Sequence, residues 1–199
     1  MLNALLVSQV VLLLLVVALG VVVFALTRQI GVLHERIAPA GALMVAGGPK
    51  VGEAAPGMEV TDIEGRTIPI GGQADDGRSR LIFFLSPTCP VCKTLLPVLK
   101  SAQKSERDWL EIQLASDGDL AEHRRFFSDA GLDSFTYLLS SALGRGYQVG
   151  KLPFAVLIDE LGIIRSKGLV NSREHLESLF EAKNRGVASI QEYFSKADH

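Results

Sequence analysis

The sequence predicts a three-layer α/β sandwich with a mixed β-sheet, preceded by one transmembrane helix. Strand and helix patterns alternate from about residue 58 onward and end in a hairpin and a helix, the order of an α/β domain. Residues 2–27 contain no charged side chain. The two cysteines, Cys89 and Cys92, lie where a short apolar run gives way to a helical pattern. These observations indicate a tethered domain organised around a dithiol.

Residues 1–27 are predicted to form a membrane anchor. The stretch 10–26 is almost wholly apolar, and about 22 such residues at a rise of about 1.5 Å each cover a hydrocarbon core of roughly 30 Å. A cleavable signal peptide is the alternative. It is disfavoured because the apolar stretch is long, no basic segment precedes it and no small-residue cleavage site follows directly. We therefore expect a single-pass contact with the lipid bilayer.

The charged residues that flank this span indicate on which side of the membrane the C-terminal part lies. Arg28 and Arg36 follow it, and this charge bias by itself favours a cytoplasmic C-terminal side. A membrane-tethered dithiol, however, is most useful in an oxidising compartment. We therefore expect a bacterial inner-membrane protein with a periplasmic domain. Residues 28–50, rich in Gly, Ala and Pro, predict a juxtamembrane linker, residues 51–185 the domain and residues 186–199 a C-terminal tail.

The domain is predicted to begin with a β-hairpin. Segments 58–62 and 67–70 flank Glu64-Gly65, which is a turn signal. A polar loop over 71–80 then leads to the run 81–85, which is short, apolar and rich in aromatics. Such a run is typical of a buried strand.

The remaining elements alternate between helix and strand. A helix is expected from about Cys89 to Lys104, with a kink at Pro97. The elements expected after it are a strand over 109–115, a helix over 117–130 with Asp117 or Asp119 as cap and Gly131 as stop, a strand over 135–139, a helical turn over 141–149, a strand over 154–159, its hairpin partner over 163–167, and a last helix from the cap Ser172 to about Lys183.

Three smaller expectations follow from these elements. Leu176, Leu179 and Phe180 should share the buried face of the last helix. His123, with Arg124 and Arg125, is predicted to lie on a solvated helix face. Asp159 and Glu160 are predicted to shape the tip of the final hairpin rather than to act as acid or base.

The sequence Cys89-Pro90-Val91-Cys92 predicts a redox dithiol. At a helix start the first thiol lies among free backbone N–H groups at the positive end of the dipole, which lowers the pKa of Cys89. Pro90 suits the first helical position, where its missing N–H had no partner. Cys92, one turn on, should be less exposed. One cysteine would attack and the other would resolve the mixed disulfide.

Other interpretations of the two cysteines are weaker. A zinc site needs two more ligands, and the four histidines have no paired spacing, so we expect neither a metal nor a cofactor. A structural disulfide across so short a loop would restrict the unfolded chain little. An inert disulfide or free thiols remain the lesser alternative. With a net charge of −2 and no basic stripe, nucleic acid is not an expected partner.

These motifs resemble the thioredoxin superfamily over about residues 51–185. The spacing from Cys89 to Pro97 matches that family's pattern, and Leu152-Pro153, directly before a strand, occupies the place of its cis-proline. The hairpin around Glu64-Gly65 is similar to the extension of membrane-tethered TlpA-type reductases. The resemblance implies a thioredoxin-like fold in which Leu152 pairs its backbone with an extended client. An ordinary turn role for Pro153 is the alternative. The implied client-binding residues are Thr88, Pro90, Val91, Leu152 and Pro153.

Two positions depart from the thioredoxin pattern. Thr88 replaces the tryptophan that usually precedes the first cysteine, which changes the apolar surface beside the thiol. Phe83 stands where the family has a buried acid that accepts a proton. Deprotonation of Cys92 must then use water or another group.

A closer resemblance is to the MauD family of methylamine utilization accessory proteins. It is carried by residues 84–93, Phe-Leu-Ser-Pro-Thr-Cys-Pro-Val-Cys-Lys, and by the N-terminal anchor. The resemblance implies a thiol–disulfide oxidoreductase or isomerase that forms or corrects disulfides in the disulfide-rich small subunit of methylamine dehydrogenase. The resemblance is also compatible with a membrane redox partner. The alternatives are a TlpA-like reductase for another client, such as apocytochrome c, and a non-catalytic binding module or chaperone.

Overall fold

The computed structural model describes residues 6, 8–9, 12–21 and 48–185, and the chain forms two units, residues 1–42 and 43–199. In the first unit residues 12–21 are helical and their leucine and valine side chains are exposed, Leu12 by 62% and Leu19 by 65%. No helix formed by the described residues has the length and apolar character needed to cross a bilayer. The rest of the predicted anchor, most of the predicted linker and the tail 186–199 lie outside the described residues.

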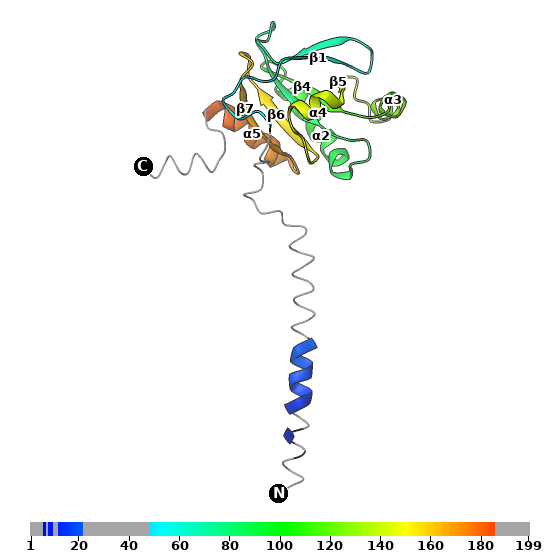
Figure 1. The fold of residues 1–199 in the computed structure, drawn as a ribbon, viewed down its shortest axis with the longest axis vertical. Coiled ribbons are helices and arrows are strands. Elements are labelled where there is room, and N and C mark those ends of the chain that lie inside the picture. Colours follow the sequence, from blue (N-terminus) through cyan, green and yellow to red (C-terminus); the bar gives the residue numbers. More distant parts are fainter. Residues whose placement is uncertain (1–5, 7, 10–11, 22–47, 186–199) are drawn as a thin grey trace, which may run out of the picture. The chain divides into compact units, whose positions relative to one another are not determined.

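The second unit is built on a five-stranded mixed sheet in the order β5-β4-β3-β6-β7 (Figure 1). Strands β3, β4 and β5 run parallel, and β6 and β7 pair antiparallel beside β3. The predicted mixed sheet is therefore confirmed. The strands are β3 Ser79–Phe84, β4 Leu110–Ser116, β5 Thr136–Leu139, β6 Phe154–Ile158 and β7 Ile164–Leu169.

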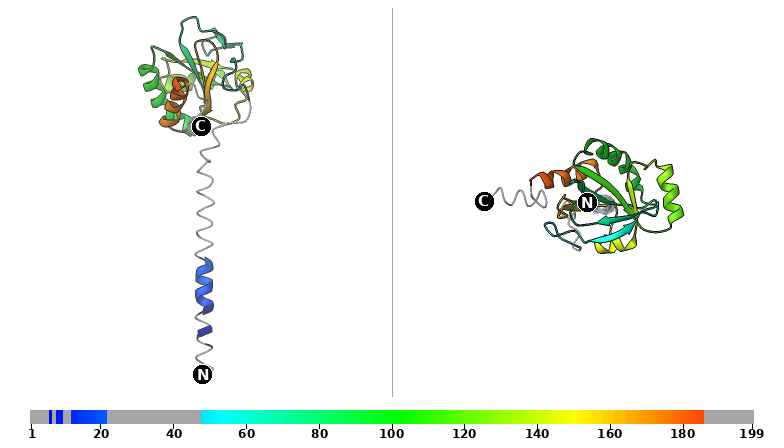
Figure 2. Two further views of the ribbon diagram at one scale, coloured as in Figure 1. Left: turned by 90° about the vertical axis from the view of Figure 1, so that its left-hand side faces the viewer. Right: turned by 90° about the horizontal axis from the view of Figure 1, so that it is seen from above.

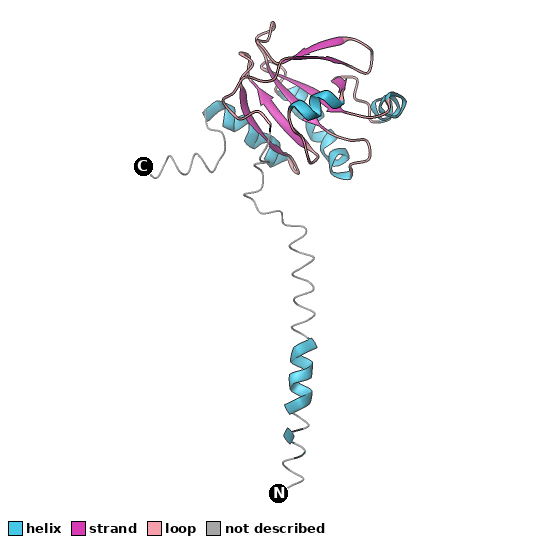
Figure 3. Cartoon of the chain, in the orientation of Figure 1, coloured by secondary structure: helices cyan, strands magenta, loops and turns pink. Residues whose placement is uncertain are grey.

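Helices cover both faces of this sheet, as Figures 2 and 3 show. They are α2 Pro90–Ser105, α3 Leu120–Asp129, α4 Ser141–Gly146 and α5 Arg173–Arg185. Alternate residues of β3 point to opposite faces. Phe83 packs in one apolar cluster with α2 and α5, and Phe84 packs in another with α4 and the N-terminal hairpin. The three layers expected from the sequence are therefore present.

The N-terminal hairpin is a separate two-stranded sheet of β1 Met58–Thr61 and β2 Thr67–Ile70. Its turn depends on Gly65, whose φ of 89° suits a residue without Cβ, and on Asp62, which accepts from the N–H groups of Glu64 (2.9 Å) and Arg66 (2.8 Å). Burial of the Asp62 carboxyl raises its pKa, but its hydrogen bonds with Arg66 outweigh that effect and the pKa is lowered overall.

Both edges of the five-stranded sheet contact N-terminal residues of this unit. At β5, the Ile63 N–H donates to the Tyr137 carbonyl (3.0 Å). Before β7, Ala54 bridges Ile163, and the Gly52 N–H donates to the Ile164 carbonyl (2.8 Å). The segment after residue 50 thus belongs to the folded unit, and it limits the exposed edges that could pair with other chains.

Two predicted helix limits need correction. The helix after β4 begins at Leu120, with Asp119 as its cap accepting from the Glu122 N–H (2.9 Å), so Asp117 is not the cap. The helical turn after β5 ends at Gly146 rather than at residue 149. It ends there because Gln148 adopts a φ of 51°, which an α-helix cannot accommodate.

The prediction for His123 is wrong. Its side chain is buried, with 2% exposed, between Tyr137 of β5 and the loop before α3. Its Nε2 lies 2.9 Å from the Asp117 carbonyl and its Nδ1 lies 2.8 Å from the Tyr137 hydroxyl. Because a carbonyl only accepts, Nε2 carries the hydrogen of its contact with Asp117. Arg124 and Arg125 remain exposed, although Arg124 also donates to the Ile63 carbonyl (2.9 Å).

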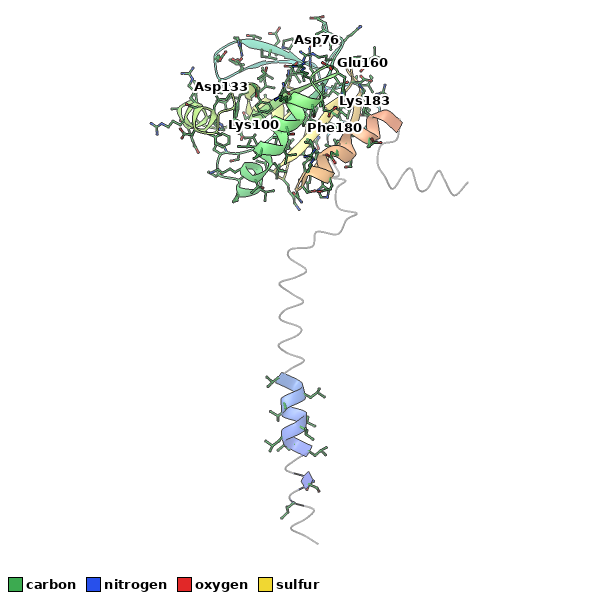
Figure 4. The ribbon with its side chains drawn as sticks, turned by 180° about the vertical axis from the view of Figure 1, so that it is seen from behind. Asp76, Lys100, Asp133, Glu160, Phe180 and Lys183 are labelled. Carbon is green, nitrogen blue, oxygen red and sulfur yellow. A yellow bond between two sulfur atoms is a disulfide. The ribbon has the colours of Figure 1, made fainter. Side chains whose placement is uncertain are left out.

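The turn at Asp159 and helix α5 match their predictions more closely. Asp159 accepts from the N–H groups of Leu161 (3.0 Å) and Ile163 (2.7 Å), the turn role that was expected. Ser172 accepts from the His175 N–H at 3.4 Å at the start of α5, whose residues Leu176 and Leu179 are buried. Figure 4 shows Glu160, from this turn, beside Lys183 of α5, and their side chains form an ion pair at 3.0 Å.

Candidate redox site

The two cysteines form a disulfide at the start of α2. Their Cα atoms are 5.3 Å apart. Cys89 is the N-cap of the helix: it has extended backbone angles, and its Sγ accepts from the Cys92 N–H at 3.2 Å. Pro90 occupies the first helical position. The expected placement of the first sulfur at a helix N-terminus is therefore confirmed.

The two sulfurs differ in access. Cys89 is partly exposed and packs at the margin of the apolar cluster under α2, whereas Cys92 has 0% exposure inside that cluster. Phe83 is also fully buried in this cluster and carries no titratable group. A client can therefore reach Cys89 first, and Cys92 lies in an apolar environment.

The turn that leads into α2 is held by hydroxyl groups. The Ser86 and Thr88 hydroxyls are 2.9 Å apart, and the Ser86 carbonyl accepts from the Cys89 N–H at 3.1 Å. Thr88 is exposed next to Cys89. A small polar residue before the first cysteine thus has a local role here, which is to close this turn.

Leu152-Pro153 lies at the same end of the sheet as the disulfide. The peptide bond is cis, as the resemblance implied. Phe154, which follows it, pairs with Phe84 at the end of β3. Pro153 is buried and its carbonyl accepts from the Val170 N–H at 3.1 Å.

Several groups at this end of the sheet face solvent. Leu152 is 41% exposed and Val91 is 40% exposed, and Pro90 between the cysteines is also exposed. Among the described residues, neither backbone group of Leu152 has a hydrogen-bond partner. The unpartnered backbone of Leu152 thus lies at the same end of the sheet as Cys89.

A pocket of about 710 Å³ adjoins this surface and was not predicted from the sequence. Phe84, Leu85 and Ala115 contribute apolar side chains, and Arg145 and Lys151 contribute cations. The other lining residues are Ser116, Asp117, Ser140, Ser141, Gly144, Gln148, Val149, Gly150 and Leu152. The available signal was topological, because ligands of α/β sheets bind beyond the carboxyl ends of parallel strands, where Asp117 and Ser140 follow β4 and β5.

The described residues contain no group of three side chains placed to hold a metal ion. Near the pocket, burial raises the pKa of Tyr147, so its phenol is neutral. The reactive pair at this end of the sheet is the disulfide of Cys89 and Cys92.

Close relatives extend over nearly the whole chain. The chain is 45% identical over 195 residues to the methylamine utilization protein MauD of Paracoccus denitrificans, covering 98% of this chain and 96% of that protein. It is 43% identical over 192 residues to the methylamine utilization protein MauD of Methylorubrum extorquens, covering 96% of this chain and 93% of that protein. No family model matches the chain.

Solved structures share the fold at lower identity. A thiol-disulfide oxidoreductase from Bacteroides fragilis superposes with a TM-score of 0.56 at 19% identity, over 65% of this chain and 98% of that chain. The thioredoxin domain of a thiol-disulfide oxidoreductase from Bacteroides vulgatus gives a TM-score of 0.55 at 18% identity, over 67% of this chain and 97% of that chain. These likenesses establish a thioredoxin-like fold.

Proposed function

Because this chain belongs to the MauD family of methylamine utilization proteins, we propose that it is a membrane-anchored thiol–disulfide oxidoreductase or isomerase that acts in the maturation of methylamine dehydrogenase. One observation carries the chemistry: a disulfide at a helix N-terminus has one sulfur that a client can reach and one that is fully buried. The proposed client is the disulfide-containing small subunit of that dehydrogenase.

The proposed reaction is thiol–disulfide exchange at Cys89. To oxidise a client, a client thiolate attacks the Cys89 sulfur, the bond to Cys92 breaks, and Cys92 leaves as a thiolate that takes up a proton. A second client thiolate then attacks the client sulfur in the mixed disulfide and releases Cys89. The client loses two electrons and the protein gains them.

The reverse sequence reduces a client disulfide. The Cys89 thiolate attacks, one client sulfur leaves as a thiolate and is protonated, and Cys92 then attacks Cys89 to release the second client thiol. If another client thiol attacks the mixed disulfide before Cys92 does, the client disulfide is rearranged without net electron transfer. Burial of Cys92 in the apolar cluster that also contains Phe83, where no titratable side chain stands, favours a slow final step and hence rearrangement.

We further propose that residues 1–27 anchor the protein in the bacterial inner membrane, that residues 28–50 link this anchor to a periplasmic domain over residues 51–185, and that residues 186–199 form a tail. Support comes from the uncharged stretch 2–27 and from the exposed apolar side chains of residues 12–21. A reporter fused at the C-terminus tests the orientation. Activity of a periplasm-dependent reporter is expected, and activity of a cytoplasm-dependent reporter would contradict it.

The client is tested by trapping. In cells grown on methylamine, the Cys92→Ala variant cannot complete the cycle and should accumulate a mixed disulfide through Cys89. The captured protein, identified by mass spectrometry after isolation from membranes, should be the dehydrogenase small subunit. The Cys89→Ala/Cys92→Ala double variant is the matched control and should capture nothing. A haem-attachment client would contradict the dehydrogenase assignment, and no captured protein would contradict disulfide exchange itself.

A further inference from the structure

We infer that the pocket beside Leu152 binds an acidic side chain of the client, so that the protein selects an extended client segment with a carboxylate near its cysteine. The inference rests on the proposed function, since it concerns how the client of Cys89 is recognised. It concerns the 710 Å³ pocket formed by α4 and the carboxyl ends of β3, β4 and β5.

The pocket and the disulfide lie at the same end of the sheet, where β3 finishes. Leu85 lines the pocket and also packs in the cluster that contains Cys92. Leu152, whose backbone groups are available to a client, forms another part of the wall. Because side chains of an extended chain alternate at about 3.3 Å per residue, a client segment paired with Leu152 places neighbours of its cysteine toward this pocket.

The charges of the lining favour an anion. Arg145 and Lys151 are exposed, and neither side chain has a carboxylate or hydrogen-bond partner among the described residues. Asp117 contributes the single carboxylate of the lining. By contrast, Arg66, Arg165 and Arg173 are paired with carboxylates at 2.7, 2.6 and 2.7 Å. In a chain of net charge −2, this is a local excess of positive charge beside the redox site.

Two hydroxyl groups of the pocket are already engaged. The Ser116 hydroxyl donates to the Leu85 carbonyl at 2.8 Å, and the Ser140 side chain accepts from the Leu143 N–H at 3.3 Å as the cap of α4. Since Phe84 and Ala115 are apolar, the cations Arg145 and Lys151 are the lining groups best placed to determine which ligand binds. Their chemistry fits a carboxylate.

The wall that carries the cations is held in place. The Gln148 N–H donates to the Arg145 carbonyl (3.0 Å), and the Val149 N–H donates to the Gly144 carbonyl (2.9 Å). Gln148 keeps a left-handed φ of 51° that a residue with a side chain seldom adopts. Gly48 packs so closely on Tyr147 that a Cβ there would overlap the Tyr147 carbonyl oxygen. Backbone strain like that at Gln148 is found at binding sites, where the surrounding structure holds the strained residue in place.

The test uses the reduced full-length protein in detergent and three peptide disulfides that differ only in residues beside the cysteine: Glu, Gln or Lys. The wild type should react with the Glu peptide about fivefold faster, in kcat/KM, than with the Gln peptide, and slowest with the Lys peptide. The Arg145→Gln/Lys151→Gln variant should lose this order. The preference should also fall with added salt.

The Arg125→Gln/Lys104→Gln variant is the matched control, because it removes the same charge from exposed positions outside the pocket. It should keep the preference for the Glu peptide. Equal rates of the wild type with all three peptides, or equal loss of preference in both double variants, would overturn the inference. Binding of free glutarate at the pocket without discrimination among the peptides would overturn it as well.

A neutral small disulfide, hydroxyethyl disulfide, separates this inference from the proposed function. The wild type and the Arg125→Gln/Lys104→Gln control should react with it at the same rate, and circular dichroism should show that every variant is folded. If the wild type fails to react with it, the redox function itself is contradicted. If it reacts normally but does not discriminate among the peptides, only the acidic-client inference fails.

Discussion

The two ends of the five-stranded sheet differ in what their polar groups contact. The closed end, defined by Ser79, Trp109, Asp159, Glu160 and Lys183, lies where β3 and β4 begin and β6 finishes. The open end, defined by Cys89, Val91, Arg145, Lys151 and Leu152, lies where β3, β4 and β5 finish. Both ends contain charged groups and exposed loops, so composition alone does not distinguish them.

At the closed end, the polar groups bind one another. Lys183 donates to Glu160 at 3.0 Å and lies 5.0 Å from the centre of the Trp109 ring, while the Ser79 hydroxyl donates to Glu160 at 3.2 Å. Asp159 is 3% exposed and accepts from two backbone N–H groups and from Arg165 (2.6 Å). Because these polar groups bind one another, few of them are available to a partner, and their contacts stabilise the fold.

At the open end, several groups lack partners among the described residues. They include the backbone of Leu152 and the side chains of Arg145 and Lys151. Val91 and Leu152 expose apolar surface beside a reachable sulfur. The comparison teaches that unused binding capacity, rather than the presence of charge, marks the functional end of this sheet.

The largest expected effect is at the closed end. Asp159→Ala should lower the free energy of unfolding by about 2–4 kcal/mol, because the N–H groups of Leu161 and Ile163 lose their buried acceptor and Arg165 loses its ion pair. Urea unfolding measures it, with Asp133→Ala, at an exposed position labelled in Figure 4, as control. The rate with hydroxyethyl disulfide should be unchanged at temperatures where the variant is folded. A loss of rate without loss of stability would break the distinction between the two ends.

A substitution at the open end should change the rate of exchange and leave the stability almost unchanged. Leu152→Asp should leave stability within about 0.5 kcal/mol, since the side chain is 41% exposed. It should slow exchange with a protein disulfide by about tenfold, the loss expected when an apolar contact of about 1.4 kcal/mol is removed. Leu120→Asp, at a position 40% exposed on α3, is the matched control. Equal slowing by both variants would mean that Leu152 has no specific contact with clients.

The strain at Gln148 predicts a gain in stability. Gln148→Gly should raise the free energy of unfolding by about 0.5–1 kcal/mol, because glycine adopts a φ of 51° without a Cβ penalty. Gln148→Ala, which keeps the Cβ, should give no gain. Thermal unfolding of both variants provides the measurement. If the glycine variant is less stable than the alanine variant, the backbone is not strained and the wall of the pocket is held for another reason.

The smallest expected effect depends on pH. A backbone hydrogen bond and then the ion pair with Lys183 hold the pKa of Glu160 below its ordinary value of 4.5. A carboxyl with a lowered pKa stabilises the fold above its unfolded pKa, and this contribution disappears as the pH falls through the folded value. Lys183→Met should therefore cost less than about 1 kcal/mol at pH 7, since Glu160 is partly exposed.

The cost of Lys183→Met should shrink as the pH falls through the lowered pKa of Glu160. Urea unfolding at pH 7 and at pH 3 compares the variant with the wild type. Methionine keeps an apolar chain over Trp109 and removes the charge together with the hydrogen bonds to Ser79 and Glu160. A difference that is the same at both pH values would assign the role of Lys183 to its cationic contact with the Trp109 ring or to its hydrogen bond with Ser79 rather than to its pair with Glu160.

Local signals in the sequence predicted much of this molecule. The helix start at Cys89, the turn at Glu64-Gly65 and the buried run 81–85 each depend on neighbours within a few residues, and the structure confirms them. The position of Pro153 came from the family resemblance, and its cis bond is also confirmed. Such features can be predicted from the sequence because the residues that determine them are adjacent in the chain.

The features that the sequence did not show depend on distant contacts. His123 is buried because Tyr137, 14 positions away, provides a hydroxyl for its second nitrogen. The pocket requires α4 to lie beside the ends of three strands, and the edge contact of Ala54 requires Ile163. No local pattern contains this information, because each arrangement arises only when the sheet order β5-β4-β3-β6-β7 is known.

The central claim is that the two sulfurs have different access, and alkylation of the reduced full-length protein tests it most directly. With limiting iodoacetamide and peptide mass spectrometry, Cys89 should be modified at least about ten times faster than Cys92, because Cys89 caps the helix at its surface and Cys92 is fully buried. Equal modification of both residues, or faster modification of Cys92, would contradict the account.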